Sequence, residues 1–376
     1  MSRKARVLFP FVGDTFGGSH VSTLLLIDEL RDSSFEPIIG VHKNGFFQHY
    51  LDEKKINWIQ LPRSTLVKKN DLAKQLAQMF LNSWTLRSFL KKQCIDIVHT
   101  NDRRMHLTWL FAAKFARKKH VWHHRTASSS RRYAHYAKFS DAFVTISRYC
   151  ARPFSNQLGD AIQVVQDPVD CSVSSKLVAN AREIIVAQSG GNSDIHVVSF
   201  VANWTEQKRP LFFLRMAHRL VGLTDIPVVF AMFGDPREPI ASRVYQMVEE
   251  LGLAANILFM GSKTPIEPWI AASDVLVATS VREGLGRTLI EAMQLGVPVV
   301  ATSDGGHREI IENHVTGSLV DQNSPEEFAQ AVADTLSSKN RTQAMVSRAK
   351  SQATEKYAPS IHAQHILAIY DEILRK

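Results

Sequence analysis

The chain has 376 residues, of which 45% are hydrophobic and 22% charged, and its formal net charge is +9 at pH 7. This length exceeds what a single hydrophobic core organises, so we expect two domains, and the composition excludes general disorder. The sequence has neither a run of about 18 apolar residues nor a signal-peptide core, and its cysteines form no CxxC pair, so we expect a cytoplasmic protein without disulfides.

The positive charge is concentrated in the first half of the chain. Residues 1–180 carry 27 Lys and Arg against 14 Asp and Glu, whereas the remainder carries 18 against 22. Such an asymmetry indicates an anionic partner for the first half, such as a phosphorylated acceptor or a lipid head-group surface. A basic face that is merely solvated explains the same numbers, and both interpretations stay open at this point.

In chain order, the first half alternates short β-rich runs with helical stretches. The run Ala5–Phe9 precedes a Gly-rich turn and the periodic segment Ser19–Leu30, which is typical of a strand followed by a helix. The later β-rich runs, which leave room for crossover helices, are Glu36–Val41, Ile95–His99, His120–Trp122 and Asp141–Ile146. We therefore predict that residues 1–180 form a doubly wound, Rossmann-like domain around a mostly parallel sheet.

The second half repeats this rhythm after a cluster of turn residues at 189–194, which is the best candidate for a linker. Its predicted strands are His196–Val201, Pro227–Phe233, Asn256–Phe259, Asp274–Ala278, Val297–Ala301 and Gly317–Val320. We predict a second Rossmann-like domain over residues 181–355. A closing helix, at residues 356–376, is expected to pack back on the first domain.

The segment between Glu283 and Glu291 carries the strongest functional pattern. A Gly loop leads into a predicted helix whose first turn offers free N–H groups to an anion. The loop and the start of the helix consist of Gly284, Leu285, Gly286, Arg287 and Thr288. Glu291 lies one turn into the helix, where its carboxylate can accept two hydroxyl hydrogen bonds from a ribose. Glu283 is expected to reach the sugar end of the same ligand.

This segment resembles the E-x7-E signature of retaining glycosyltransferases of family 4, which have the GT-B fold. The flanking stretches 274–280, 291–300 and 305–311 resemble the family as well. The resemblance implies an α/β protein with two Rossmann-like domains that face each other across a cleft. It also implies a nucleotide-sugar donor, UDP- or GDP-linked, that binds chiefly to the second domain and transfers its sugar with retention of configuration.

Residues upstream of the signature complete the donor site that the resemblance implies. Lys208 matches the family's lysine and is expected to be catalytic with Glu283, because an ammonium stabilises the charge on a departing diphosphate. Arg209 is its basic neighbour, whereas Asn203 stands where the family usually has an arginine. Gly234 and Gly261 lie in turns where the backbone is expected to approach the nucleotide.

The first half supplies the residues that we expect on the acceptor side. Gly17 and Gly18 resemble the family's N-terminal Gly-rich loop, although a plain strand-to-helix turn explains them equally well. Similar enzymes often have a catalytic histidine at the end of a strand, and both His123 and His124 qualify. Adjacent strand residues point to opposite faces, so only one of the two can face the cleft. Further candidates at the ends of strands are His99, Asn101 and Arg125.

These features predict a retaining hexosyltransferase that acts on a glycan or glycolipid acceptor in the biosynthesis of a cell-surface polysaccharide or lipopolysaccharide. We expect that the enzyme requires no cofactor or metal. By analogy, we expect it to act in the cytoplasm, at the inner face of the cytoplasmic membrane. One alternative is another GT-B enzyme, such as a nucleotide-sugar epimerase or a phosphorylase. A nucleic-acid-binding protein is a remote one, since the pI of 9.4 comes without an RNA-binding or zinc-finger pattern.

Overall fold

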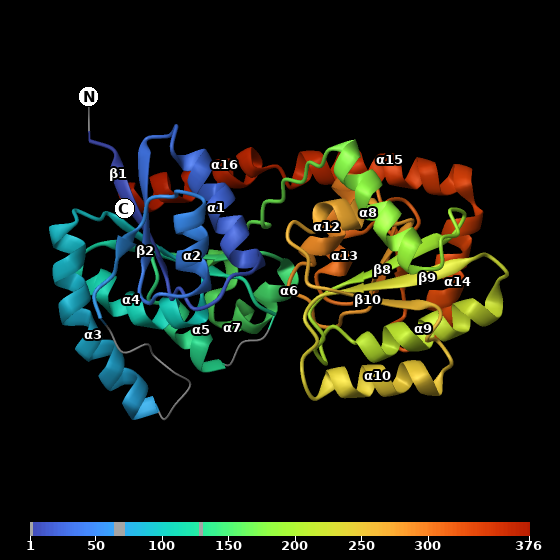
Figure 1. The fold of residues 1–376 in the computed structure, drawn as a ribbon. Coiled ribbons are helices and arrows are strands. Elements are labelled where there is room, and N and C mark those ends of the chain that lie inside the picture. Colours follow the sequence, from blue (N-terminus) through green and yellow to red (C-terminus); the bar gives the residue numbers. More distant parts are fainter. Residues whose placement is uncertain (1–2, 64–71, 128–130) are drawn as a thin grey trace. The chain divides into compact units, whose positions relative to one another are not determined.

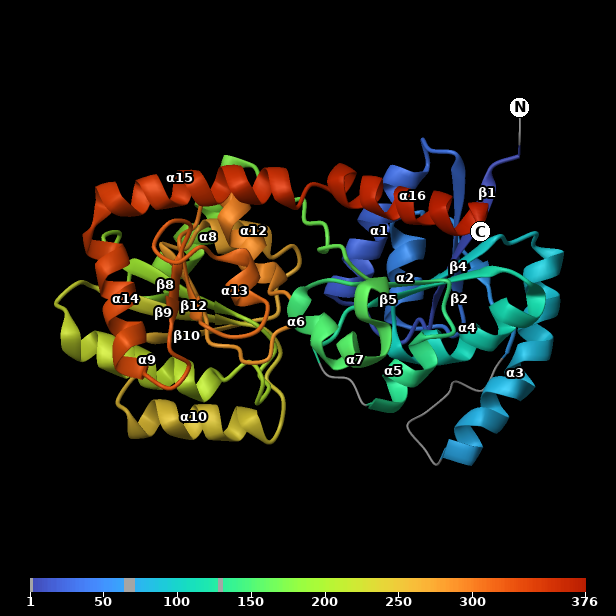
Figure 2. The same ribbon diagram turned by 180° about the vertical axis from the view of Figure 1, so that it is seen from behind.

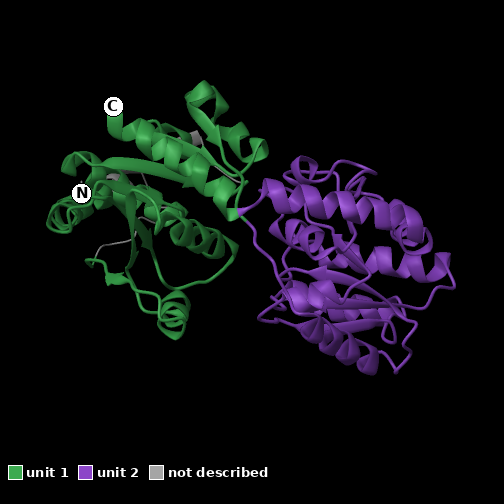
Figure 3. Ribbon diagram, turned by 90° about the horizontal axis from the view of Figure 1, so that it is seen from above, with its two compact units in different colours: residues 1–168, 359–376 green, residues 169–358 purple. Residues whose placement is uncertain are grey.

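A computed structural model gives the fold of the chain and describes residues 3–63, 72–127 and 131–376 (Figure 1). The chain divides into two compact units (Figure 3). Unit 1 consists of Met1–Pro168 and Pro359–Lys376, and unit 2 consists of Val169–Ala358. None of the helices in the described ranges combines the length and the apolar character that crossing a bilayer requires.

The boundary between the units differs from the prediction, which placed it after residue 180. Helix α8 (Ser175–Gln188) belongs to unit 2, because its Ala181 and Ile185 pack into the same core as Val197 and Val229. The turn cluster at 189–194 therefore lies inside unit 2 and links no domains. The closing segment joins unit 1 from Pro359 onward, three residues later than predicted.

Unit 1 is built on a seven-stranded parallel sheet in the order β3-β2-β1-β4-β5-β6-β7. The strands are β1 (Ala5–Phe11), β2 (Phe35–Val41), β3 (Ile59–Gln60), β4 (Ile97–Thr100), β5 (Lys119–His124), β6 (Ala142–Thr145) and β7 (Ile162–Val164). The helices are α1 (Gly18–Leu30), α2 (Phe46–Glu53), α3 (Leu72–Lys92), α4 (Arg103–Ala116), α5 (Arg131–Ala137), α6 (Arg148–Ala151), α7 (Ser155–Leu158) and α16 (Pro359–Arg375), with short 3-10 turns at Arg152–Phe154 and Gly159–Ala161.

Helices cover both faces of this sheet, which explains why its central strands are continuous apolar runs without alternation. On one face, Val7 and Phe9 of β1 pack against α1, α2 and α16. On the other face, Leu8 and Val98 pack against α3 and α4. The last helix of the chain is thus part of the core of the first unit.

Unit 2 is built on a six-stranded parallel sheet in the order β10-β9-β8-β11-β12-β13, and α14 packs beside α9 on one of its faces (Figure 2). The strands are β8 (His196–Val201), β9 (Val228–Phe233), β10 (Ile257–Gly261), β11 (Val275–Ala278), β12 (Val299–Thr302) and β13 (Ser318–Val320). The helices that follow α8 are α9 (Pro210–Leu223), α10 (Ile240–Glu250), α11 (Glu267–Ala271), α12 (Arg287–Leu295), α13 (His307–Ile310), α14 (Pro325–Ser337) and α15 (Lys339–Lys356).

Candidate functional site

The strand order of unit 2 reverses between its two central strands, β8 and β11. In doubly wound sheets, ligands bind outside the carboxyl ends of the strands at such a reversal. The loop 202–209 follows β8, and the loop 279–286 follows β11 and leads into α12. Most of the predicted donor residues therefore lie on the two loops that border this point.

Hydrogen bonds join these two loops. The hydroxyl of Thr279 donates to the carbonyl oxygen of Lys208 at 2.8 Å, and the N–H of Val281 donates to that of Gln207 at 3.0 Å. The Nζ of Lys208 then reaches across and donates to Oε2 of Glu283 at 2.6 Å. The two residues predicted to be catalytic in this unit thus form an ion pair, and their side chains remain 31% and 18% exposed.

Glycines allow a third loop, between β12 and α13, to pack against the Gly loop. Gly286 has a φ of 102°, and a Cβ atom there would lie 2.8 Å from Cδ2 of His307. A Cβ atom on Gly306 would lie 2.5 Å from the carbonyl oxygen of Gly284. The N–H of Gly306 donates to the carbonyl oxygen of Glu283 at 2.9 Å. The third loop therefore fixes the backbone from which Glu283 projects.

Helix α12 begins directly after the Gly loop, with Gly286 as its N-cap and no side chain that caps it. Because it follows a strand, its N-terminus and the positive end of its dipole lie at the carboxyl edge of the sheet. Nη2 of Arg287 lies 3.4 Å from Oε1 of Glu291, one turn further on. Burial raises the pKa of Glu291, and the Arg287 guanidinium opposes this shift. An anion and hydroxyl groups can therefore be bound side by side here.

The predicted glycines at the ends of β9 and β10 bring strand ends together. Gly234 has a φ of 116°, and a Cβ atom on it would lie 2.1 Å from the carbonyl oxygen of Ala202. Its N–H donates to the carbonyl oxygen of Gly261 at 3.0 Å. Asn203, the predicted replacement of a family arginine, accepts the N–H of Asp235 through Oδ1 at 3.0 Å. In this structure Asn203 thus orders the turn after β9.

Arg209 is directed to different neighbours from those of Lys208. Its Nη1 donates to the carbonyl oxygen of Gln322 at 2.5 Å, and its guanidinium carbon lies 4.2 Å from the centre of the Phe212 ring. Burial lowers its pKa. The structure therefore brings the Lys208 ammonium to Glu283 and holds the Arg209 guanidinium against the loop after β13.

In unit 1 the strand order reverses between β1 and β4, and the predicted acceptor residues lie in the last residues of β4 and β5 or in the loops that follow β1, β4 and β5. Two of the histidines are neighbours there, because Nε2 of His99 lies 3.1 Å from Nδ1 of His123. Nδ1 of His99 lies 2.5 Å from the hydroxyl of Tyr370 in α16. Both histidines are fully buried, and burial lowers the pKa of each well below its ordinary value.

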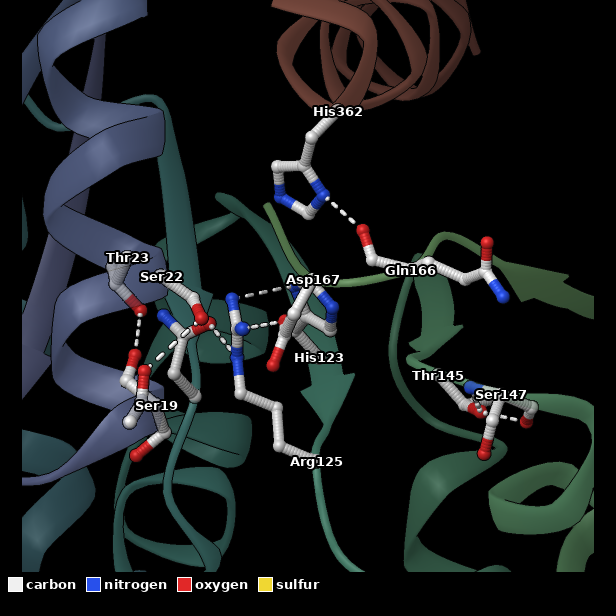
Figure 4. A network of polar contacts seen from close by, with 12 residues as sticks. Ser19, Ser22, Thr23, His123, Arg125, Thr145, Ser147, Gln166, Asp167 and His362 are labelled. Carbon is white, nitrogen blue, oxygen red and sulfur yellow. Dashed lines mark hydrogen bonds and ion pairs between the residues drawn. The ribbon is translucent and has the colours of Figure 1, made fainter. Parts of the chain in front are cut away.

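Arg125 lies at the centre of this network (Figure 4). Its guanidinium is paired with the carboxylate of Asp167, donates to Oδ1 of Asn101 at 3.1 Å and lies 3.3 Å from Nδ1 of His123. The side chains of Arg125 and Asp167 are only 3% and 4% exposed. A buried ion pair is tolerated where further hydrogen bonds satisfy its polar atoms, as they do here. The network unites four of the predicted residues, including His99.

His124 lies on the opposite face of β5, as the alternation of strand residues requires. Its ring packs in a T-shaped arrangement with the Phe154 ring, 4.7 Å between centres, and burial lowers its pKa to about 4. Gly17 and Gly18 are exposed and form the start of α1, with Gly17 as the N-cap. His124 is therefore separated from the Arg125 network.

Two family profiles match the chain in succession. The profile described as Glycosyltransferase Family 4 matches residues 16–173, and the profile described as Glycosyl transferases group 1 matches residues 181–352. The chain belongs to glycosyltransferase family 4. The second match contains both loops around Lys208 and Glu283, so the candidate donor site of this family 4 chain lies wholly within it.

Several curated relatives resemble this family 4 chain. It is 30% identical to an uncharacterized glycosyltransferase of Methanocaldococcus jannaschii, over 56% of this chain and 54% of the relative. It is 32% identical to the lipopolysaccharide core mannosyltransferase LpsB of Rhizobium meliloti, over 37% and 40%. These two alignments therefore span about half of each relative or less. A galactosyltransferase of Escherichia coli is 23% identical over 81% of this chain and 80% of the relative.

Solved structures share the fold over the whole chain. A glycosyltransferase from Rickettsia africae has a TM-score of 0.85 at 21% identity, and the match covers 100% of both chains. Alr3699/HepE from Anabaena, solved in complex with UDP and glucose, has a TM-score of 0.79 at 20% identity over 97% of this chain and 99% of that chain. The GT-B fold predicted from the sequence is thereby confirmed.

Some residues of the family 4 chain that shape these sites were not singled out from the sequence. His307 packs against Gly286 and is hydrogen-bonded through Nδ1 to Thr302 at 3.1 Å. Asp167 and Tyr370 complete the network of unit 1. A signal existed for His307, because it lies in the stretch 305–311 that resembles the family. No local pattern marks Tyr370.

Proposed function

We propose that this family 4 member is a retaining glycosyltransferase that moves a sugar from a nucleotide-diphosphate sugar to a glycan or glycolipid acceptor. The observation that carries the proposal is the grouping of the α12 N-terminus with Lys208, Glu283 and Glu291 at the strand-order reversal of unit 2. It combines a helix end and a cation, which suit a diphosphate, with two carboxylates, which suit hydroxyl groups.

Each group in the donor site has a distinct role in this proposal. Glu291 accepts hydrogen bonds from the ribose, and the first turn of α12 at Arg287 and Thr288 binds the diphosphate. Lys208 stabilises the charge that builds on the leaving diphosphate, and Glu283 orients the transferred sugar. Because Lys208 and Glu283 are 2.6 Å apart, an arriving phosphate has to share the ammonium with this carboxylate.

The charge of Lys208 and the α12 dipole would take the place of a divalent cation, and we propose transfer without a metal. In the ranges that the structure describes, no three His, Cys, Asp or Glu side chains are grouped so that they could hold a metal ion. The test is turnover after treatment with EDTA. Unchanged turnover supports the proposal, and a loss that Mg²⁺ restores contradicts it.

We assign the acceptor to unit 1, with His123 in preference to His124. His123 shares its network with His99, Asn101 and Arg125, whereas His124 packs against Phe154. The names of two relatives support a surface glycan as the product. One is a lipopolysaccharide core mannosyltransferase, and the other is named for galactosyl transfer to GlcNAc-diphosphoundecaprenol, a lipid-linked sugar. Such an acceptor would place the protein at the inner face of the cytoplasmic membrane.

Donor binding is the direct test. A thermal-shift screen should include UDP-glucose, UDP-galactose, UDP-GlcNAc and GDP-mannose, starting with uridine compounds because the Anabaena structures contain UDP and UDP-glucose. A donor present at 100 times its Kd should add about 2.7 kcal/mol to the stability of the folded state. Calorimetry should then show that Glu291→Ala abolishes binding, whereas Glu355→Ala, an exposed control in α15, does not.

An unchanged affinity in Glu291→Ala would remove the ribose assignment, and a failure to bind any nucleotide sugar would remove the proposed function. The stereochemistry is checked separately by NMR of the product. We expect the transferred sugar to keep the anomeric configuration that it had in the donor.

A further inference from the structure

Large apolar side chains are exposed on α3, on α4 and just after α5. These three helices lie near one another in both views of the ribbon (Figures 1 and 2). The exposed side chains are Phe80 (58%), Leu81 (77%), Trp84 (72%), Phe115 (43%) and Phe139 (49%). We refer to these five, with the half-buried Phe111 at their centre, as the aromatic surface. Exposed apolar groups of this size and grouping mark an interaction site more often than chance exposure.

The four phenylalanine rings of the aromatic surface form one connected group. The ring of Phe80 lies 5.9 Å from that of Phe111 and 5.7 Å from that of Phe115, measured between centres. Phe111 in turn lies 6.1 Å from Phe139. Three segments that are distant in the sequence thus contribute to one apolar area.

A cation is built into the aromatic surface. The guanidinium carbon of Arg87 lies 5.2 Å from the centre of the Trp84 ring, and its Nε donates to the carbonyl oxygen of Phe115 at 3.0 Å. Arg87 therefore connects α3 to the end of α4 and places a positive charge among the rings.

The sequence around the aromatic surface is much richer in basic than in acidic residues. Residues 72–95 and 103–140 together contain 14 Lys and Arg and no Asp or Glu. Of these cations, Lys91, Arg117 and Lys138 are exposed at the ends of α3, α4 and α5. The neighbouring Asp141 is already engaged by Lys114 at 3.3 Å. Arg104, Lys118 and Arg125 are likewise paired with carboxylates. The positive charge beside the aromatic surface therefore comes from exposed cations such as Lys91, Arg117 and Lys138.

We infer that the aromatic surface is a docking site for a membrane that contains anionic lipids. Aromatic and leucine side chains insert at the boundary between head groups and acyl chains, and Lys and Arg next to them bind anionic head groups. The rim of a protein–protein interface is polar too, so charge at the rim does not by itself distinguish a protein partner from a membrane. The bias toward positive charge over both segments, however, matches a surface that is uniformly anionic. This charge complementarity selects the anionic bilayer as the occupant.

The inference deepens the proposed function, because a lipid-linked acceptor is met at the same bilayer that the aromatic surface binds. It does not depend on the donor site, since the aromatic surface lies in unit 1 and the donor residues lie in unit 2. Vesicle binding and nucleotide binding can therefore fail independently, and each is measured without the other.

The test is flotation of the full chain with vesicles of phosphatidylcholine and phosphatidylglycerol at a ratio of about 70 to 30, compared with pure phosphatidylcholine. We expect binding to the anionic vesicles only, and release at high salt. The double variant Phe80→Ser, Trp84→Ser should need at least about tenfold more lipid for half-binding, because two apolar side chains no longer insert. Phe46→Ser, which alters a 76% exposed side chain in α2, should bind like the wild type.

The contribution of the basic residues to vesicle binding is tested with a charge-reversal variant and a matched control variant. Lys91→Glu with Lys138→Glu should also raise the half-binding lipid concentration by at least about tenfold, whereas Lys339→Glu with Arg348→Glu in α15 should not, although the net charge changes equally. Circular dichroism and UDP calorimetry are run on every variant to show that it is folded. The inference is overturned if the wild type binds only neutral vesicles. It is also overturned if both Phe80→Ser, Trp84→Ser and Lys91→Glu, Lys138→Glu bind vesicles as the wild type does.

Two further outcomes would assign the aromatic surface to another partner and thereby overturn the inference. One is a wild-type dimer in light scattering that Phe80→Ser, Trp84→Ser converts to a monomer. The other is salt-sensitive binding to random oligonucleotides that the same variant loses, with no binding to vesicles.

Discussion

Two glycines at opposite ends of α12 allow the packing of the Gly loop to be separated from backbone strain. Gly286 is the N-cap, with a φ of 102°, and Gly296 is the C-cap, with a φ of 78°. A Cβ atom on Gly286 would lie 2.8 Å from the ring of His307, which is buried and hydrogen-bonded. At Gly296 the nearest atom, in Val346, would be 3.9 Å away.

Replacement by alanine should therefore affect the two positions differently. Both variants carry a positive-φ cost of about 1–2 kcal/mol, but only Gly286→Ala adds steric overlap, which costs about 1–3 kcal/mol. At about 2–4 °C per kcal/mol, Gly296→Ala should lower the Tm of unit 2 by a few degrees and Gly286→Ala by about twice as much. Since the α12 N-terminus shifts only in Gly286→Ala, the Kd for UDP should rise at least about tenfold in that variant alone.

Scanning calorimetry measures the Tm values, and titration calorimetry measures the Kd values. Equal Tm values for the two variants would refute the overlap with His307. A wild-type Kd in Gly286→Ala, despite a lowered Tm, would show that the Gly loop does not position the nucleotide.

Three further predictions concern charged groups. Lys208→Ala should lower kcat at least about a hundredfold, and turnover near the wild-type rate would exclude Lys208 from the chemistry. Asp167→Asn leaves Arg125 buried without its carboxylate, so unit 1 should lose about 3–5 kcal/mol in denaturant unfolding, whereas the exposed Asp160→Asn should change little. Unit 1 should also unfold before unit 2 as the pH falls. Burial lowers the pKa of His120 and His362 to about 3 and that of His42 and His124 to about 4. Below about pH 6.5 these histidines take up protons in the unfolded chain but not in the folded unit. Each of them should therefore lower the free energy of unfolding of unit 1 by about 1.4 kcal/mol at pH 5.5, and by more toward pH 4. Hydrogen exchange reports which unit opens first, and earlier opening of unit 2 would contradict this reasoning.

Much of the fold could be predicted because buried parallel strands are short apolar runs separated by turn residues. The strand at His196–Val201 was predicted with its observed bounds. The edge strands β3 and β7 were missed, because two or three residues carry no recognisable pattern. The domain boundary was misplaced for a different reason. Whether α8 packs on one sheet or the other depends on tertiary contacts of Ala181 and Ile185, which its own sequence does not reveal.

The candidate donor site could be located because its glycines and glutamates are close together in the sequence. The contacts that complete the two sites could not be predicted, because the residues that make them are far apart in the sequence. Lys208 and Glu283 are 75 residues apart, and His99 and Tyr370 are 271 apart. Neither pair has a sequence pattern that links its members, so only the folded chain shows them together.

Because the chain returns to unit 1 at its carboxyl end, unit 1 cannot complete its folding before unit 2 has been synthesised. Ile366, Ile369 and Tyr370 of α16 belong to the same core as Val7 and Phe9 of β1. During translation the ribosome completes all of unit 2 before it synthesises these residues. Until α16 emerges, this face of the amino-terminal sheet is covered only by α1 and α2, so the core of unit 1 is completed last. Removal of α16 would therefore destabilise unit 1, at the other end of the sequence, before it affects unit 2.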